Sequence, residues 1–195
     1  MKELIVASSN ANKIREFKEM LTPLGYCVKG LSDLDVQITI VEDGETFQEN
    51  AYKKAKTVYD VLHCEVISDD SGICINAMGG RPGVKSARFL GESTSYEYKN
   101  NYILEEIKDA EDRRARYVCA ICHIDADGKA NTYTGECLGE IANEPRGEGG
   151  FGYDPIFYYP PYHTTLANVS DAEKNLISHR AKALNMLLEG MKQHD

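Results

Sequence analysis

Apolar positions in the chain alternate between short continuous runs and stripes at helical spacing. Leu4–Ala7 is a short apolar run typical of a buried strand, and polar residues follow it over 8–12. A helix is then predicted that ends near Pro23 and Gly25. Its apolar stripe is Ile14, Phe17, Leu21 and Leu24. A strand, a turn and a helix in this order indicate the α/β class.

A second helix is predicted behind the capping box of Thr46–Glu49. Its apolar stripe comprises Phe47, Ala51, Ala55, Val58 and Leu62. Glu65–Ser68 reads as a short strand that runs into a polar turn, Asp69–Gly72, after which Ile73 and Ile75 indicate that a strand resumes.

The second half of the chain predicts a hairpin between two helices. Ser95 is expected to cap a helix with Tyr96, Ile103 and Ile107 facing inward. The strands Arg116–Asp125 and Ala130–Leu138 are joined by a turn at Asp127-Gly128, which makes the sheet mixed.

A last helix is predicted behind the capping box of Ser170–Glu173. Its stripe is Ile177, Ala181, Leu184, Leu188 and Met191. The pattern contains no internal repeat or long linker, so we expect a single domain over residues 1–195.

Composition narrows the class of protein. The net charge of -9 disfavours a non-specific nucleic-acid binder, which needs basic surface. No apolar run approaches the ~20 residues of a membrane span, and the first residues lack a signal-peptide core, so a cytoplasmic protein is expected. Cys119 and Cys122 form a CxxC within a predicted strand, where residues three apart point to opposite faces, so we expect two buried thiols.

The polar turn at residues 8–13 is a candidate anion site. Free N–H groups and the helix dipole at a helix N-terminus attract phosphate. Side chains of the turn add donors and a cation: Ser8, Ser9, Asn10, Asn12 and Lys13. The alternative is an ordinary helix cap with solvated charges.

Asp69 and Asp70 are candidate metal ligands. Two carboxylates at a strand end provide the oxygen ligands that Mg²⁺ prefers, and like charges side by side raise one pKa, which favours a general base. The alternative is a solvated acidic turn. Glu42, in a second acidic loop, is a weaker candidate of the same kind.

A glycine-rich segment, Gly147–Pro155, contains G-x-G-x-x-G, but prolines flank it and no strand precedes it, so a dinucleotide fold is rejected. Phe151 and Tyr153 could stack on a flat base while Asp154 accepts its N–H groups. The alternative is a loop whose aromatic rings cover the core. Further along, the last helix begins with donors suited to phosphate or a purine carbonyl: Lys174, Ser178, His179 and Arg180.

Taken in order, these segments resemble the inosine triphosphate pyrophosphatase family, which hydrolyses non-standard purine nucleoside triphosphates. The matching stretches cover residues 8–184: SSNANK (8–13), TFQENAYKKA (46–55), ISDDSG (67–72), GGRPGVKSAR (79–88), GGFGYDPIF (149–157) and EKNLISHRAKAL (173–184).

The resemblance implies an elongated α/β fold, in which a long mixed sheet is flanked by helices and a central cleft separates two lobes. It also implies a homodimer that depends on Mg²⁺ and acts on a nucleotide rather than on nucleic acid or a membrane. The reaction would convert ITP, dITP or XTP to the monophosphate and pyrophosphate.

Site residues follow from the same resemblance. Asp70 would be catalytic and would hold Mg²⁺ with help from Glu42 and Asp69. Residues expected to bind substrate are Ser8, Ser9, Asn10, Ala11, Asn12, Lys13, Lys54, Ser71, Phe151, Gly152, Tyr153, Asp154, Lys174, His179 and Arg180.

Two other functions remain open at this point. A Maf-like pyrophosphatase would have a similar fold and prefer modified pyrimidine nucleotides. A non-catalytic regulator would bind nucleotide without releasing pyrophosphate, but carboxylates near phosphates weaken such binding unless a metal intervenes.

Overall fold

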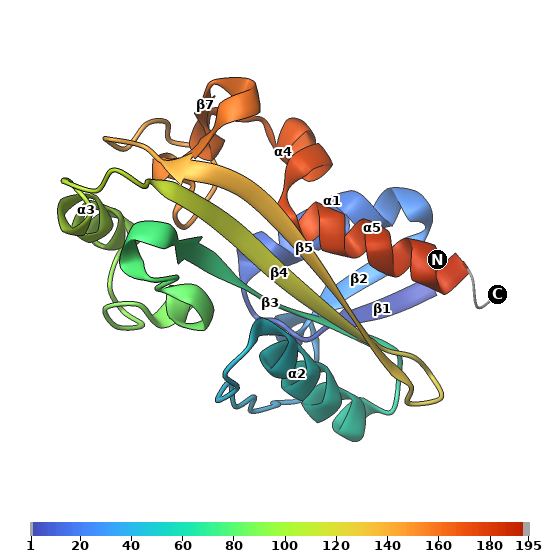
Figure 1. Ribbon diagram of the computed structural model, residues 1–195. Coiled ribbons are helices and arrows are strands. Elements are labelled where there is room, and N and C mark those ends of the chain that lie inside the picture. The colour runs from blue at the N-terminus through green and yellow to red at the C-terminus, as the bar shows by residue number, and fades with distance from the viewer. Residues whose placement is uncertain (1, 193–195) are drawn as a thin grey trace. The chain divides into compact units, whose positions relative to one another are not determined.

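A computed structural model describes residues 2–192 of the chain (Figure 1). The strands are β1 (Lys2–Val6), β2 (Tyr26–Gly30), β3 (Val66–Ile75), β4 (Arg114–Ile124), β5 (Ala130–Ile141), β6 (Phe157–Tyr159) and β7 (Thr164–Thr165). The α-helices are α1 (Ala11–Leu21), α2 (Phe47–Leu62), α3 (Tyr96–Glu106), α4 (Asp171–Ile177) and α5 (His179–Lys192).

The strands form a mixed sheet in the order β2-β1-β3-β4-β5-β6-β7. β1 pairs in parallel with β2 and β3, whereas β6 pairs antiparallel with β5 and β7. The predicted α/β class with a mixed sheet flanked by helices is therefore confirmed.

The chain divides into two compact units. Unit 1 is drawn from Met1–Asp70, Cys119–Gly135 and Arg180–Asp195, and unit 2 from Ser71–Val118 and Glu136–His179. A single domain over residues 1–195 stays a prediction.

Unit 1 is a three-layer arrangement, with α1 and α5 on one face of the strands and α2 on the other (Figure 1). The α1/α5 face is packed by residues such as Val6, Phe17, Ile67, Cys119 and Leu184. The α2 face is packed by Ile5, Ala51, Val58, Val66 and Cys122, among others. Cys119 and Cys122 thus lie on opposite faces, as the strand period predicts, and burial raises the pKa of the Cys119 thiol to about 12.

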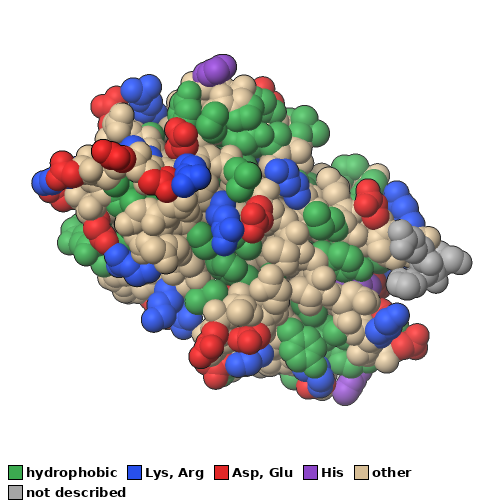
Figure 2. All heavy atoms as spheres, viewed as in Figure 1, with side chains coloured by type: hydrophobic (Ala, Val, Ile, Leu, Met, Phe, Trp, Pro, Cys, Tyr) green, Lys and Arg blue, Asp and Glu red, His purple; other side chains and the backbone are tan. Residues whose placement is uncertain are grey.

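Charged side chains of both signs are interspersed over the face of the molecule drawn in Figure 2. Among the helices of residues 2–192, none combines the length and the apolar character that a membrane span requires.

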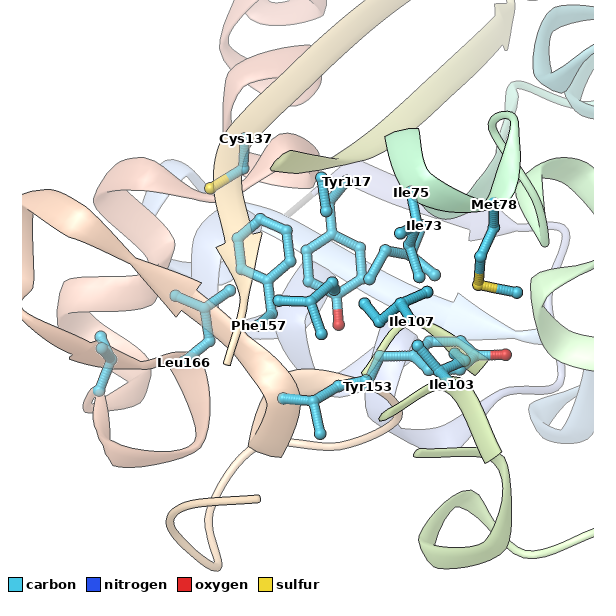
Figure 3. Packing of buried hydrophobic residues seen from close by; sticks show 14 residues of the cluster. Ile73, Ile75, Met78, Ile103, Ile107, Tyr117, Cys137, Tyr153, Phe157 and Leu166 are labelled. Atoms are coloured by element: carbon cyan, nitrogen blue, oxygen red, sulfur yellow. The ribbon is translucent and has the colours of Figure 1, made fainter. Parts of the chain in front are cut away.

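Unit 2 encloses a separate apolar core (Figure 3). Ile73 and Ile75 of β3 pack there against Tyr117 of β4. Ile103 of α3 and Ile107, which ends that helix, belong to the same core. Phe157 and Tyr117 lie at the centre, with ring centroids 4.5 Å apart. This core supports the loop that precedes β6, which is part of the candidate site.

The predicted turn at Asp69–Gly72 is wrong, because β3 runs unbroken from Val66 to Ile75. Apolar residues on both sides of the four polar ones are fully buried, so the strand has core contacts before and after them. Asp69 and Asp70 therefore occupy successive positions of one strand and point to opposite faces.

The predicted last helix is two helices, because Ser178 takes an extended conformation with ψ 156°. Ile177 packs on the core of unit 2, whereas Ala181 and Leu184 belong to unit 1. One apolar stripe in the sequence thus serves two cores.

Three smaller predictions also need correction. Leu24 lies in a 3-10 turn beyond α1 and is exposed. Tyr96 of α3 is 38% exposed rather than inward-facing, although its ring packs edge-on against Tyr153. In the Thr46 capping box only one half forms, since the Glu49 carboxylate accepts the N–H of Glu45 instead of that of Thr46.

Candidate active site

The turn between β1 and α1 is closed by its own side chains. The Asn10 Oδ1 accepts the N–H groups of Asn12 and Lys13 at 3.0 and 3.2 Å, and the Asn10 N–H donates to the Ser8 Oγ at 3.1 Å. Locally this is an ordinary helix cap. Ser9, Asn10, Ala11 and Asn12 are exposed, so phosphate binding at this helix N-terminus stays a prediction.

Asp69 is enclosed by cations on the α1/α5 face of unit 1. Its Oδ2 lies 3.0 Å from the Lys13 Nζ and 3.1 Å from the Arg180 Nη2, and Arg180 also pairs with Glu16. Burial alone would raise the pKa of Asp69, but Lys13, Arg180 and Lys54 hold it well below its usual value. The carboxylate is therefore ionised and its charge already neutralised.

This network bears on two predictions. Arg180 is 1% exposed and bound to two carboxylates, so its guanidinium stabilises the fold of unit 1, and its contact with substrate stays a prediction. Glu42, Asp69 and Asp70 do not gather as three metal ligands, since residues 2–192 contain no such group of three. The strand period is the reason, because it turns Asp69 away from the side of β3 that Asp70 occupies.

Asp70 has a different environment on the α2 face. Its Oδ1 lies 3.6 Å from the Lys54 Nζ, and Lys54 also pairs with Glu42 and donates to the backbone carbonyl of Asp69 at 3.1 Å. Burial raises the pKa of Asp70 and outweighs the opposing effects of Lys54, Lys13 and a hydrogen bond from Asn50. For Lys54, burial lowers the pKa but the carboxylates of Asp69, Asp70 and Glu42 prevail and raise it.

The Asp70 Oδ2 is buried and has no hydrogen-bond partner among the described residues. A buried carboxylate oxygen without a partner is costly, and such atoms mark places where a proton, a water or a metal ion binds. Together with its raised pKa, this makes Asp70 the best candidate in unit 1 for a general base or metal ligand.

In unit 2, Asp154 holds the glycine-rich loop closed. Its Oδ2 accepts the Phe151 N–H at 3.0 Å and lies 2.8 Å from the Lys174 Nζ, while its Oδ1 accepts the Tyr117 hydroxyl at 3.1 Å. Gly150 has a positive φ of 66°, and a Cβ there would lie 2.3 Å from the Asp154 Oδ2. Only glycine fits this close approach.

These contacts bear on the roles predicted for two residues of the loop. Asp154 is 2% exposed and its carboxylate is bound within unit 2, and its contact with the N–H groups of a base stays a prediction. Tyr153 is buried in the core, where its hydroxyl donates to the Ser86 carbonyl, so it does not offer a free face for stacking (Figure 3). For Tyr153 the alternative of an aromatic ring that covers the core is the correct one.

Other residues of the predicted base site do gather in unit 2. The His179 ring stacks on Tyr117 with centroids 4.7 Å apart and planes 11° apart. The Lys174 Nζ lies 4.6 Å from the centre of the half-buried Phe151 ring, and the Gly152 carbonyl accepts from Asn100 at 3.2 Å. Ser71, the first residue of unit 2, is half-buried on β3.

Comparison with known proteins decides the family. Residues 4–190 match the model of the Ham1 family. The chain belongs to the Ham1 family. The predicted resemblance is thereby confirmed over nearly the whole chain.

Relatives of this Ham1 chain have closely similar lengths. It is 46% identical over 189 residues to a protein of Bacillus subtilis named dITP/XTP pyrophosphatase, and the match covers 96% of both chains. A Staphylococcus aureus protein of the same name is 42% identical over 195 residues, with 98% and 99% covered. Among solved structures, the Ham1 protein of Staphylococcus aureus has a TM-score of 0.89 at 40% identity with full coverage of both chains. The HAM1 protein of Coxiella burnetii has a TM-score of 0.88 at 36% identity, with 99% and 100% covered.

Sequence reasoning missed three buried polar residues of this Ham1 chain: Glu16, Asn50 and Tyr117. Asn50 and Lys54 are four residues apart and border the apolar stripe of α2, so helical spacing alone could have found them. No local signal marks Glu16, whose partner Arg180 is 164 residues away.

Proposed function

We propose that this chain hydrolyses non-standard purine nucleoside triphosphates such as dITP, XTP and ITP to the monophosphate and pyrophosphate. Family membership and the names of the relatives support this activity. The structural observation that carries it is the Asp70 carboxylate, which is buried beside Lys54 with an unpartnered Oδ2 and a raised pKa. The Asp69 Oδ1 is also buried without a partner, but of the two acids only Asp70 combines such an oxygen with a raised pKa, a combination typical of functional sites.

Charge around Asp70 supports a role for Mg²⁺. The network in unit 1 contains three cations (Lys13, Lys54 and Arg180) and four carboxylates (Glu16, Glu42, Asp69 and Asp70). The network has no net positive charge, so Lys13 and Lys54 need a divalent cation beside them to hold a triphosphate.

The oxygen donors present fit a hard divalent cation. Asp70 has an unpartnered oxygen, and Glu42 approaches the same Lys54 ammonium. Mg²⁺ is typically bound through one or two carboxylates together with substrate phosphates. We assign Asp70 and Glu42 to hold it, where it would neutralise phosphate oxygens and lower the pKa of a bound water.

The chain's own residues supply the other parts of the reaction. Lys13 and Lys54 bind phosphate oxygens, and the capped turn at Ser8–Lys13 presents the positive end of α1. The Asp70 carboxylate oxygen that does not hold the cation accepts a proton from the attacking water. The water oxygen bonds to the α-phosphorus, the bond from the α-phosphorus to the bridging oxygen breaks, and pyrophosphate departs.

We assign the purine to unit 2. The half-buried Phe151 offers a ring surface, His179 offers a ring nitrogen, and the backbone of the loop at Gly152 offers polar groups. A His179 N–H donated to a 6-oxo group would favour hypoxanthine and xanthine and reject adenine, whose 6-amino group is itself a donor. A cleft that unites these residues with those of unit 1 stays a prediction.

A pyrophosphate-release assay tests the proposed function. We expect rapid release from dITP, ITP and XTP in Mg²⁺ and slow release from GTP and ATP. Preference for UTP or methylated pyrimidine nucleotides would instead indicate the Maf-like activity. Tight binding of ITP without pyrophosphate release would indicate a regulator.

Further expectations concern partners and location. We propose a homodimer without affinity for nucleic acid, located in the cytoplasm. Family resemblance motivates the dimer, and the net charge of -9 supports the absence of nucleic-acid binding. Sedimentation equilibrium, a DNA and RNA mobility-shift assay and cell fractionation test these three points.

A further inference from the structure

Asn50 is a polar residue in an apolar setting. It lies in the first turns of α2 and is 1% exposed, next to Ala51 and one turn before Lys54. A buried carboxamide is destabilising unless its donors and its acceptor are satisfied. The partners of Asn50 therefore show what the residue is for.

One side of the Asn50 carboxamide binds the loop that precedes α2. The Asn50 Oδ1 accepts the Gly44 N–H at 2.8 Å, and its Nδ2 lies 3.5 Å from the Gly44 carbonyl. A Cβ on Gly44 would lie only 2.6 Å from the Asn50 Oδ1, so the loop can approach this closely only with glycine. Gly44 is two residues from Glu42, whose carboxylate meets Lys54.

The other side of the carboxamide reaches β3. The Asn50 amide also lowers the pKa of the Asp70 carboxyl, as a nearby hydrogen-bond donor does, and Lys54, one turn further along α2, lies 3.6 Å from the Asp70 Oδ1. One buried amide thus fixes the loop of Glu42 beside the carboxylate of Asp70, and both carboxylates approach the Lys54 ammonium. Removing the amide would free the loop of Glu42 and take a polar neighbour away from the Asp70 carboxyl.

We propose that Asn50 is a positioning residue, which holds the loop of Glu42 and the side chain of Asp70 in the arrangement that binds a divalent cation. The inference rests on the proposed function, since it concerns the Mg²⁺ site assigned there. Residues that orient metal ligands through hydrogen bonds change metal affinity by about 10–100-fold when removed.

Three variants of the full chain test this role. Asn50→Ala removes the carboxamide, and Gly44→Ala disturbs the same contact from the loop side. Gln48→Ala is the matched control, because it also removes a hydrogen-bonded carboxamide from α2, but an exposed one that bonds to Thr134 at 3.0 Å. The probe is Mn²⁺ in the absence of nucleotide, with its Kd measured by electron paramagnetic resonance.

We expect the Mn²⁺ Kd to rise about 10-fold or more in Asn50→Ala and Gly44→Ala and to stay unchanged in Gln48→Ala. The Mg²⁺ concentration for half-maximal turnover of dITP should rise in parallel, while kcat at saturating Mg²⁺ falls much less. If Asn50 only stabilised the fold, its substitution would lower the Tm without raising the Mn²⁺ Kd more than it lowers kcat.

Wild-type Mn²⁺ affinity in folded Asn50→Ala would overturn the inference, as would an equal loss in the Gln48→Ala control. If Asn50→Ala does not fold, Gly44→Ala decides by the same criterion. A wild-type chain that binds Mn²⁺ but releases pyrophosphate from no nucleotide would refute the proposed function and leave the inference on Asn50 open to test. The Mn²⁺ Kd values of the variants would then decide whether Asn50 positions the metal ligands.

Discussion

Asp69 and Asp70 are neighbours in the sequence, yet their carboxylates lie on opposite faces of β3. Asp69 pairs with Lys13 and Arg180, whereas Asp70 approaches Lys54 of α2. The first carboxylate is neutralised by cations and has a lowered pKa, while burial raises the pKa of the second. Two identical side chains thereby have opposite electrostatic environments, one that favours the ionised carboxylate and one that favours the protonated form.

Substitution of Asp70 should separate chemistry from binding. Asp70→Asn keeps the shape of the side chain but cannot accept a proton, so we expect kcat for dITP to fall by about 10²–10⁴-fold. Nucleotide binding, measured by equilibrium dialysis, should survive. Asp60→Asn, an exposed acid on α2, is the control and should retain activity. Full turnover by Asp70→Asn would remove Asp70 from the mechanism.

Substitution of Arg180 should act on folding. Arg180→Met leaves Glu16 and Asp69 buried without their guanidinium, and breaking a buried ion pair in this way costs about 3–5 kcal/mol. Urea unfolding should show this loss in the free energy of unfolding. Arg114→Met removes an exposed arginine that pairs with Asp112, and we expect little change there. Equal stability of the two variants would contradict the structural role of Arg180.

Local patterns in the sequence predicted the elements whose signals lie close together. Ser95 and Ser170 cap helices as expected, and the turn at Gly128 joins β4 to β5. Each of these features depends on residues within one or two turns of the chain, so the sequence contains the information directly.

The roles of buried charged residues could not be predicted in the same way. Asp69 and Arg180 are 111 residues apart, and Asp154 and Lys174 are 20 apart. Motif resemblance placed these residues at the site but could not tell which would be bound to another part of the protein. The unbroken β3 was missed for a related reason, because polar composition outweighed the apolar residues that flank it.

Loss of the Asp154 carboxylate should affect recognition of the base. Asp154→Ala removes the carboxylate that joins the Phe151 N–H to the Lys174 ammonium, so the loop loses its fixed conformation. We expect KM for dITP to rise about 10-fold while kcat falls less, because the loop would bind the base equally in the substrate complex and in the transition state. Circular dichroism confirms that the variant is folded, and Glu148→Gln, an exposed change in the same loop, is the control. An unchanged KM would disprove the link between loop closure and base binding.

Removal of divalent cations should stop turnover. The carboxylates in the network around Lys54 outnumber its cations, so a triphosphate needs a divalent cation there. EDTA should therefore abolish pyrophosphate release, and added Mg²⁺ should restore it. A chelator-treated chain that still turns over dITP, with metal content checked by elemental analysis, would refute the metal role.

Acid should weaken unit 1 through Glu65. The hydrogen bond from His123, at 2.8 Å, outweighs burial and with Lys2 holds the pKa of Glu65 below its usual value of 4.5. Above pH 4.5 the carboxylate is ionised in both folded and unfolded chains, and its stabilising effect is complete. Below that pH the unfolded chain takes up the proton first, so the free energy of unfolding falls as the pH drops through the lowered pKa.

Glu65→Gln separates this effect from the titration of other carboxyl groups. The variant should be less stable than wild type at pH 7, and the difference in the free energy of unfolding should shrink as the pH is lowered below 4.5. Urea unfolding at several pH values between about 3 and 7 gives both curves, because this range includes the pH at which carboxyl groups titrate. Glu92→Gln, which changes an exposed carboxyl, should leave the curve nearly unaltered. Parallel curves for wild type and Glu65→Gln would show that the Glu65–His123 contact does not depend on the ionised carboxylate.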